Sequence, residues 1–370
     1  NCASTGAPRM HEPAFWTRPS SLTSRFLLPF AALYGTVAAR RMARPGADAG
    51  VPVICVGNYH TGGAGKTPTV LALVKMLREL GETPFVLSRG YGGSSPGPLR
   101  VDIARHRAAE VGDEPLMMAA HAPVVIARDR VAGARLARGE GASVIVMDDG
   151  FQNPALRKDF SLIVVNAARG LGNGRVLPAG PLRAPPAPQL ARTDALLVIG
   201  EGEAAADVER ALVARGVRVF HARVTPDAET VAALRGKRVL AFAGIGDPGR
   251  FFDTLRTHGI EVAAERTFPD HHRFMKDEVW ALRAEAERDG LALVTTEKDF
   301  ARLSGDLAAL RDGITPLPVS LRFDDEARLR ELIAIKLRVA IRGSGESDRQ
   351  VASCTDLQHE NRRPRAGGDP

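Results

Sequence analysis

Six short apolar runs constrain this chain more than any other feature. They are VPVICVG (51–57), PFVLS (84–88), PVVIA (123–127), SVIVMD (143–148), SLIVV (161–165) and ALLVIG (195–200). Strands covered on both faces are apolar at every position, whereas strands with one wet face alternate. Between the first two runs, apolar residues recur at helical spacing from Val70 to Leu80, and Gly81 follows as a stop signal. The pattern predicts an α/β fold with a doubly wound, mostly parallel sheet.

The chain is expected to divide into five segments. A second series of apolar runs and helical patterns begins near residue 236 and predicts a smaller α/β domain. The polar end of the chain has no apolar period and is expected to be disordered. The predicted segments are an uninformative extension (1–13), an N-terminal membrane-associated helical segment (14–45), a core domain (46–230), a smaller C-terminal α/β domain (231–342) and the tail (343–370).

Composition narrows the classes of partner. Hydrophobic residues make up 44% of the 370 residues and charged residues 25%, which is typical of a globular protein. The net charge of +7 comes from scattered arginines without a basic block interleaved with aromatics, so no nucleic-acid partner is expected. A membrane surface or an anionic substrate fits better. The three cysteines are far apart and predict a reducing compartment.

The segment RFLLPFAALYGTVAARRMAR (25–44) is apolar with arginines at both ends. It is shorter than the roughly 20 apolar residues of a membrane span, and Pro29 and Gly35 interrupt it. The run continues through the basic cluster into the first core strand, which disfavours a cleaved signal peptide. A helix lying in the membrane interface is one interpretation, and an amphipathic helix packed on the protein's own core is the other.

The stretch GNYHTGGAGKTP (57–68) follows the first apolar run and predicts a phosphate-binding loop of the P-loop NTPase type. His60 stands where the first glycine of the usual pattern would be. Lys66 would contact the ATP phosphates, and the Thr67 hydroxyl would bind Mg²⁺. The residues predicted to bind phosphate are His60, Thr61, Gly62, Gly63, Ala64, Gly65, Lys66 and Thr67.

Asp148 and Asp149 end the run SVIVMDD at the carboxyl edge of the predicted sheet, where ligands of open α/β sheets bind. A carboxylate at this edge would supply the metal ligand that the phosphate site needs. Together with the loop they predict binding of ATP with Mg²⁺. GTP is disfavoured because the nearest string to the guanine motif N-K-x-D is TEKD (296–299). Thr61 stands where membrane-cycling ATPases carry a lysine, so a small-molecule kinase is favoured over an ATPase switch.

A kinase also needs a base for the accepting hydroxyl. The candidates are Asp113 in VGDEP and Asp270, His271 and His272 in FPDHHRF. Each has a structural alternative. Asp113 is equally consistent with the start of a helix, and the DHH string with a surface turn or part of a zinc site.

Taken together, these motifs resemble the tetraacyldisaccharide 4'-kinase family of lipid A biosynthesis. The resemblance runs from about Phe15 to the early 300s. Besides the strings quoted above, it rests on LSRGYGG (87–93), RDRVAGA (128–134), DDGFQ (148–152), GNGRVLPAGPLR (172–183), AGIGDPGRFF (243–252) and TTEKD (295–299).

The resemblance implies transfer of the ATP γ-phosphate to the 4'-hydroxyl of an acylated disaccharide lipid, tetraacyldisaccharide 1-phosphate, giving the bis-phosphorylated lipid A precursor. The reaction would take place at the cytoplasmic face of the inner membrane of a Gram-negative bacterium. The remaining alternative, from another class, is a membrane-associated ATPase switch or scaffold that binds ATP without phosphorylating a lipid.

The resemblance also implies residue roles. Asp113 would take up the hydroxyl proton, and His271, from the second domain, would orient it, so the two domains would close over the substrates. Asp148 and Asp149 would serve the metal. The implied contacts to the acceptor are Arg89, Tyr91, Arg130 and Gln152. The chain departs from the family at His60, at Asn153-Pro154-Ala155 after DGFQ, and at Asn166, where an aspartate is usual.

Overall fold

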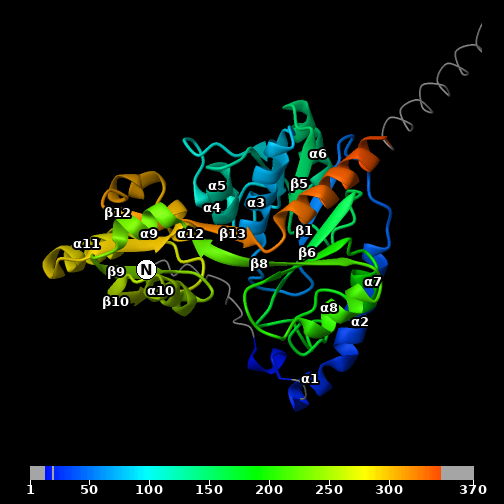
Figure 1. The fold of residues 1–370 in the computed structure, drawn as a ribbon, viewed down its shortest axis with the longest axis horizontal. Helices are drawn as coiled ribbons and strands as arrows, with labels where there is room; N and C mark the ends of the chain where they lie inside the picture. The colour runs from blue at the N-terminus through cyan, green and yellow to red at the C-terminus, as the bar shows by residue number, and fades with distance from the viewer. Residues whose placement is uncertain (1–12, 19–20, 343–370) are drawn as a thin grey trace, which may run out of the picture.

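The computed structural model describes residues 13–18 and 21–342. Within these residues the chain forms two separate sheets, one of nine strands and one of four. Figure 1 shows the smaller sheet with its helices beside the larger one, and α1 and α2 along the lower edge. The predicted extension, apart from Pro13, and the predicted tail 343–370 lie outside the described residues.

The nine-stranded sheet confirms the predicted fold class. Its order is β13-β8-β7-β6-β1-β5-β2-β4-β3, and all neighbours are parallel except at the two edges, where β3 and β13 run antiparallel. The six apolar runs are β1, β2, β4, β5, β6 and β7, and their residues are buried because both faces of the sheet are covered. The strand bounds are β1 Val53–Gly57, β2 Pro84–Ser88, β3 Leu99–Arg100, β4 Val124–Ile126, β5 Val144–Asp148, β6 Phe160–Asn166, β7 Ala195–Ile199, β8 Arg218–Pro226 and β13 Val319–Phe323.

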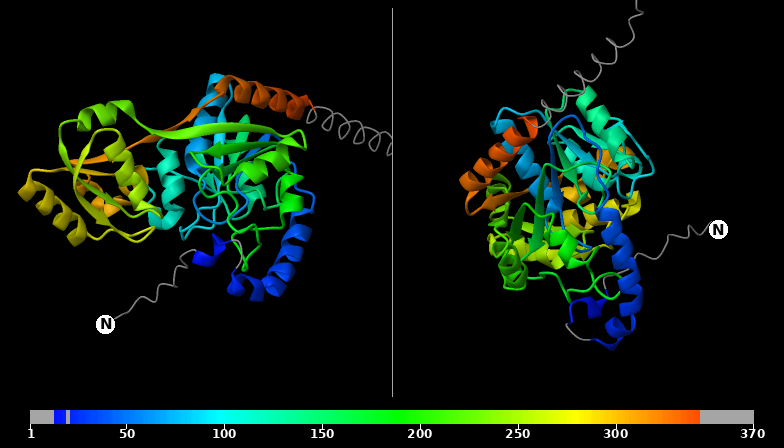
Figure 2. Two further views of the ribbon diagram at one scale, coloured as in Figure 1. Left: turned by 60° about the horizontal axis from the view of Figure 1, so that its bottom comes forward. Right: turned by 90° about the vertical axis from the view of Figure 1, so that its right-hand side faces the viewer.

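Helices cover both faces of this sheet (Figure 2). One core contains the apolar face of α3, whose Val70, Leu73 and Leu77 are fully buried as the helical spacing predicts. The other core contains apolar residues of α2, α6 and α8. The bounds are α2 Leu28–Met42, α3 Lys66–Glu79, α4 Ala108–Val111, α5 Asp113–Ala119, α6 Arg130–Gly139, α7 Pro186–Leu190 and α8 Ala206–Val213.

The smaller sheet is entirely parallel, in the order β10-β9-β11-β12. Two further cores lie on its faces, one around Phe252 and Leu255 and the other around Phe242 and Val279. The bounds are α9 Ala228–Leu234, β9 Arg238–Ala243, α10 Pro248–Thr257, β10 Glu261–Thr267, α11 Lys276–Asp289, β11 Ala292–Thr296, α12 Glu297–Arg302, η2 Gly305–Leu310 and β12 Ile314–Leu317.

After β12 the chain returns to the larger sheet, so residues 319–342 do not belong with the smaller one as the sequence suggested. Strand β13 pairs with β8, and a helix over 326–342 follows it. Leu329, Ile333 and Leu337 of this helix are buried in the core that also contains α3. Their spacing predicts a buried helical face but does not say which sheet covers it.

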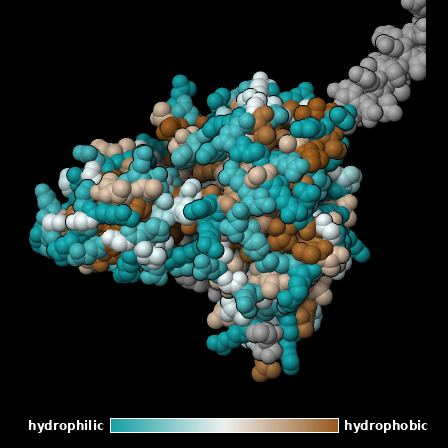
Figure 3. Space-filling model, in the orientation of Figure 1, coloured by the Kyte–Doolittle hydropathy of each residue, from teal (hydrophilic) through white to brown (hydrophobic). Residues whose placement is uncertain are grey.

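The N-terminal segment forms η1 (Ala14–Trp16), α1 (Leu22–Phe26) and α2. Helix α2 packs through small residues: a Cβ on Gly35 would lie 3.2 Å from Pro185 Cγ. The larger apolar side chains of α1 and α2 point outward: Phe26 of α1 is 78% exposed, and Phe30 and Leu33 of α2 are 58% and 69% exposed. Figure 3 shows hydrophobic side chains at the lower end of the molecule, where α1 and α2 lie. Among the described residues, no helix has both the length and the apolar character needed to cross a bilayer.

Candidate active site

The predicted phosphate loop connects β1 to α3. Gly62 and Gly65 adopt φ values of +91° and +93°, which L-residues with a side chain rarely adopt. A Cβ on Gly65 would also lie 2.7 Å from Ile199 Cδ1. Lys66 begins α3, so the loop directs the N-terminal backbone N–H groups of this helix toward the space in front of it. Residues 61–67 line a cavity there.

The position of His60 does not fit its predicted role in binding phosphate. Its imidazole is fully buried and is not part of the cavity wall, because the backbone of the loop pairs with residues 181–183. His60 Nδ1 lies 2.7 Å from the Thr61 carbonyl oxygen, which can only accept, so Nδ1 carries the proton. Burial lowers the pKa of His60 to about 4, and the positive charges of Arg169 and Lys66 act in the same direction. A neutral imidazole turned away from the cavity cannot donate to a phosphate.

Asp148 and Asp149 lie opposite the phosphate loop at the end of β5. Asp149 Oδ1 accepts a hydrogen bond from Arg183 Nη1 at 2.7 Å and lies 3.7 Å from Lys66 Nζ. Burial raises the pKa of Asp149, but the charges of Lys66 and Arg183 outweigh it and hold that pKa below its ordinary value. The backbone of Asp149 has φ +49°, an uncommon conformation that turns its side chain toward these two cations.

Asp148 is in a different electrostatic environment. Its Oδ2 accepts a hydrogen bond from Ser88 Oγ at 3.1 Å, and its side chain is buried. Burial, together with the negative charges of Glu114 and Asp149, raises the pKa of Asp148 to about 7. The site therefore concentrates negative charge that a cation would stabilise. No cluster of three or more histidine, cysteine or acidic side chains with metal-binding geometry occurs in residues 13–18 and 21–342. A Mg²⁺ site does not require such a cluster, because one or two carboxylates can be completed by phosphate oxygens and water.

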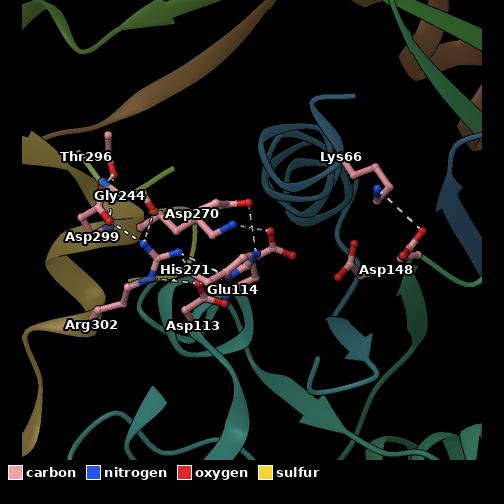
Figure 4. A network of polar contacts seen from close by, with 12 residues as sticks. Lys66, Asp113, Glu114, Asp148, Gly244, Asp270, His271, Thr296, Asp299 and Arg302 are labelled. Atoms are coloured by element: carbon pink, nitrogen blue, oxygen red, sulfur yellow. Dashed lines mark hydrogen bonds and ion pairs between the residues drawn. The ribbon is translucent and has the colours of Figure 1, made fainter. Parts of the chain in front are cut away.

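The structure brings together Asp113, which lies beside the larger sheet, and His271, which lies beside the smaller sheet. Asp113 is the first residue of α5, and His271 lies in the loop between β10 and α11 with φ +59°. His271 Nδ1 lies 2.8 Å from Asp113 Oδ2, and because a carboxylate accepts, Nδ1 donates. On the other side of the ring, Nε2 lies 3.7 Å from Asp270 Oδ2. Figure 4 shows this group together with Lys66 and Asp148. Neighbouring His272 instead pairs with Glu278 at 2.8 Å, so the two imidazoles face different partners.

Arg302, a buried residue at the end of α12, is a member of the site that no sequence motif predicted. Its Nε and Nη2 donate to Asp113 Oδ2 at 3.0 and 2.5 Å. Burial raises the pKa of Asp113, but the hydrogen bond from His271 and the charges of Lys298 and Arg302 hold it well below its usual range. The only sequence signal was the spacing of Arg302 from Asp299, three residues apart in a short helix, which pair in the structure.

The four residues predicted to contact the acceptor differ in their surroundings, although all line the cavity. Arg89 and Tyr91 are exposed, and the Tyr91 ring lies 6.2 Å from that of His271. Arg130 is buried, and its guanidinium faces the backbone carbonyl of Asp148 at 3.4 Å. Gln152 donates to the Asn58 carbonyl at 2.7 Å, which supports the phosphate loop.

The cavity has a volume of about 3230 Å³. Single ligand pockets usually have about 300–1,000 Å³, so this one can hold more than one substrate. Its wall includes the phosphate loop, Asp113 and His271, and it extends to Tyr34 and Val37 on α2. The exposed apolar face of α2 is therefore continuous with the site that contains the phosphate loop.

Comparison with known proteins identifies relatives of this chain. A family model described as tetraacyldisaccharide-1-P 4'-kinase matches residues 23–338. The tetraacyldisaccharide 4'-kinase of Nitrobacter hamburgensis is 65% identical over 330 residues, which cover 89% of this chain and 98% of that protein. The enzyme of the same name from Bradyrhizobium diazoefficiens is 64% identical over 325 residues, covering 88% and 96%.

A solved structure is also similar. The "apo" form of LpxK from Aquifex aeolicus, determined in complex with ATP, matches with a TM-score of 0.68 and 29% sequence identity. The match covers 85% of this chain and 100% of that one. The two proteins therefore share their fold across both sheets.

Proposed function

Because this chain belongs to the tetraacyldisaccharide-1-P 4'-kinase family and is an ATP-dependent kinase, we propose that Asp113 and His271 catalyse its phosphoryl transfer. The acceptor is the 4'-hydroxyl of tetraacyldisaccharide 1-phosphate. The observation that carries the proposal is the 2.8 Å contact of Asp113 with His271 at the wall of the cavity that the phosphate loop also lines.

In the proposed reaction, Asp113 orients the 4'-hydroxyl and accepts its proton as the oxygen attacks the γ-phosphorus and ADP leaves. Phosphoryl transfer passes through a loose transition state, so the proton becomes acidic only as the new bond forms. A carboxylate with a lowered pKa can therefore act as the base, because its position contributes more to the rate than its basicity does. Lys66 and the N-terminus of α3 stabilise the negative charge on the phosphates.

We propose Mg²⁺ as the cation that accompanies ATP. Thr67 and Asp148 would hold it, with Asp149 nearby. Burial and the negative charges of Glu114 and Asp149 raise the pKa of Asp148, and a cation at this carboxylate would offset both effects, which supports the assignment. Bound Mg²⁺ would neutralise charge on the β- and γ-phosphates. Asp149 also bonds Arg183, which fixes its position relative to Lys66.

We propose that α1 and α2 lie at the membrane surface. Their exposed apolar side chains would enter the interface, and arginines at the end of α2 would face anionic headgroups. The continuity of this face with the cavity supports the idea, because the acyl chains of the substrate would remain in the bilayer while its sugar reaches Asp113. The proposed site of the reaction is therefore the cytoplasmic face of the inner membrane.

Membrane association is testable with the double variant Phe26→Asp/Phe30→Asp. Each phenylalanine would contribute about 1.5–3 kcal/mol to the free energy of membrane binding when it is buried in the interface. The double variant loses both contributions, so the fraction that floats with anionic vesicles should fall at least tenfold. ATP hydrolysis or binding measured in detergent checks that the site is intact. Equal flotation of the variant and the wild type would rule out this surface as the anchor.

The catalytic proposal is tested by transfer of labelled phosphate from ATP to purified tetraacyldisaccharide 1-phosphate in detergent. Asp113→Asn should lower kcat by about 10²–10⁴, the usual contribution of a general base, and leave ATP binding unchanged. His271→Asn should lower kcat without altering ATP binding either. Near wild-type turnover by Asp113→Asn would refute the base assignment. ATP binding without transfer by the wild type would instead favour the ATPase switch.

A further inference from the structure

Arg302 contacts the proposed base directly, although it is not among the residues that the family motifs single out. We propose that Arg302 is a positioning residue: its guanidinium, acting with His271, fixes the Asp113 carboxylate so that Oδ1 is the oxygen that receives the hydroxyl proton. This inference rests on the proposed role of Asp113.

The two oxygens of the Asp113 carboxylate differ in their hydrogen bonds. Oδ2 accepts from His271 Nδ1 at 2.8 Å, from Arg302 Nε at 3.0 Å and from Arg302 Nη2 at 2.5 Å. Oδ1 accepts from the backbone N–H of Glu114 at 3.0 Å. Each carboxylate oxygen has about two acceptor sites, so three donors saturate Oδ2 whereas Oδ1 keeps a site for the substrate.

Arg302 is itself held in place by hydrogen bonds. Its Nη1 donates to Asp299 Oδ1 at 2.5 Å and to the Gly244 carbonyl at 2.6 Å. Asp299 is fully buried, and its Oδ2 accepts from the Gly244 N–H at 3.0 Å and from Thr296 Oγ1 at 2.7 Å. These bonds tie the guanidinium to the ends of β9 and β11. The smaller sheet therefore presents Arg302 in one orientation.

The contacts on Asp113 join the two parts of the molecule. Asp113 begins α5 beside the larger sheet, whereas Arg302 in α12 and His271 in the loop after β10 belong to the part around the smaller sheet. Without these three donors, the carboxylate would keep only its local bond to Glu114. Two donors from α12 and one from the His271 loop together fix its rotation. The proton-accepting oxygen is therefore oriented only while the two parts are in contact.

The test is a double-mutant cycle on lipid phosphorylation, with kcat and the KM for ATP measured for each variant. Arg302→Gln alone should lower kcat about 100-fold, the effect expected for misplacing a reacting group by roughly 1 Å, with the KM for ATP within threefold of wild type. In an Asp113→Asn background, Arg302→Gln should change kcat by less than threefold, because the residue acts through Asp113.

Two further variants separate positioning from folding. Arg283 is also an arginine of the smaller part, but it donates to the carbonyls of Leu310 and Asp312 and is remote from Asp113. Arg283→Gln should therefore keep wild-type kcat. Arg302→Lys keeps the charge but offers no two-pronged donor, so it should lower kcat at least tenfold with an unchanged KM for ATP. If Arg302→Gln does not fold, the kcat of Arg302→Lys tests the positioning role instead.

Each outcome has one meaning. Full turnover by Arg302→Gln or Arg302→Lys overturns the positioning role while the kinase proposal stands. Effects of Arg302→Gln and Asp113→Asn that multiply also overturn it, since Arg302 would then act independently of the carboxylate. Loss of kcat in Asp113→Asn together with the non-additive cycle supports it. Near wild-type turnover by Asp113→Asn instead removes the proposed base on which the inference rests.

Discussion

Replacing His60 by asparagine tests the placement of this imidazole away from the phosphates. The folded pKa of His60 is about 4 because the ring is buried near cations, whereas an unfolded histidine has a pKa near 6.5. Between these values the unfolded chain binds a proton that the folded chain does not, so stability falls as the pH drops from about 6.5 toward 4. At pH 5 the linkage relation gives a loss of about 2 kcal/mol from this residue alone.

The assay is urea unfolding of the wild type and His60→Asn at pH 7.5 and pH 5. Asparagine keeps a donor for the Thr61 carbonyl but does not titrate, so the variant should lose about 2 kcal/mol less unfolding free energy on acidification. All other ionisable groups are common to both proteins. The KM for ATP should change less than threefold. An identical pH dependence, or a large increase in the KM for ATP, would show that the imidazole is solvated or faces the nucleotide.

Three further predictions concern the phosphate loop and its metal. Lys66→Ala should lower kcat in the phosphate-transfer assay by about 10²–10³, as expected for removing one charge stabiliser of the transition state, and retained turnover would contradict the loop assignment. Gly65→Ala should lower the free energy of unfolding, measured in urea, by about 1–2 kcal/mol because the backbone at this position has a left-handed φ. An unchanged midpoint of urea unfolding would show that alanine is not strained there. Chelation with EDTA should abolish transfer, and Asp148→Asn should raise the Mg²⁺ concentration needed for half-maximal rate; transfer in EDTA would exclude the metal.

The larger sheet and the phosphate loop follow from the sequence because their signals are local. A strand buried on both faces must be apolar throughout, and the loop's glycines are required by φ values that the structure confirms for Gly62 and Gly65. Asp113 and His271 were paired only through the family resemblance. No local pattern connects two residues that are 158 positions apart.

The differences from the sequence analysis have long-range causes. The position of the His60 side chain depends on a backbone bridge to Leu182, more than a hundred residues along the chain. Arg302 was missed because an arginine in a short helix usually faces solvent, and only the packing of α12 against α5 makes it buried. The last helix was assigned to the nearer sheet because amphipathic spacing does not identify its partner.

The return of the chain through β13 makes the smaller part an insertion, and this has a mechanical consequence. The chain leaves the larger sheet at the end of β8 and re-enters it at the start of β13, where Pro226 and Val319 are paired. The Asp227 N–H also bonds the Pro318 carbonyl at 2.9 Å, so the outgoing and incoming backbones are joined at the crossing. Figure 2 shows both strands running between the two parts.

A body attached through two adjacent, hydrogen-bonded strands is restrained differently from one on a single linker. Twisting or sliding would break the ladder between β8 and β13, whereas bending across the ribbon leaves it intact. Bending across this ribbon would change the distance between Asp113 and the pair Arg302 and His271, whose contacts with Asp113 join the inserted part to the larger one. A shear of one residue between β8 and β13 would displace Arg302 and His271 from Asp113, and it would also disturb the core that contains Phe220 and Leu321.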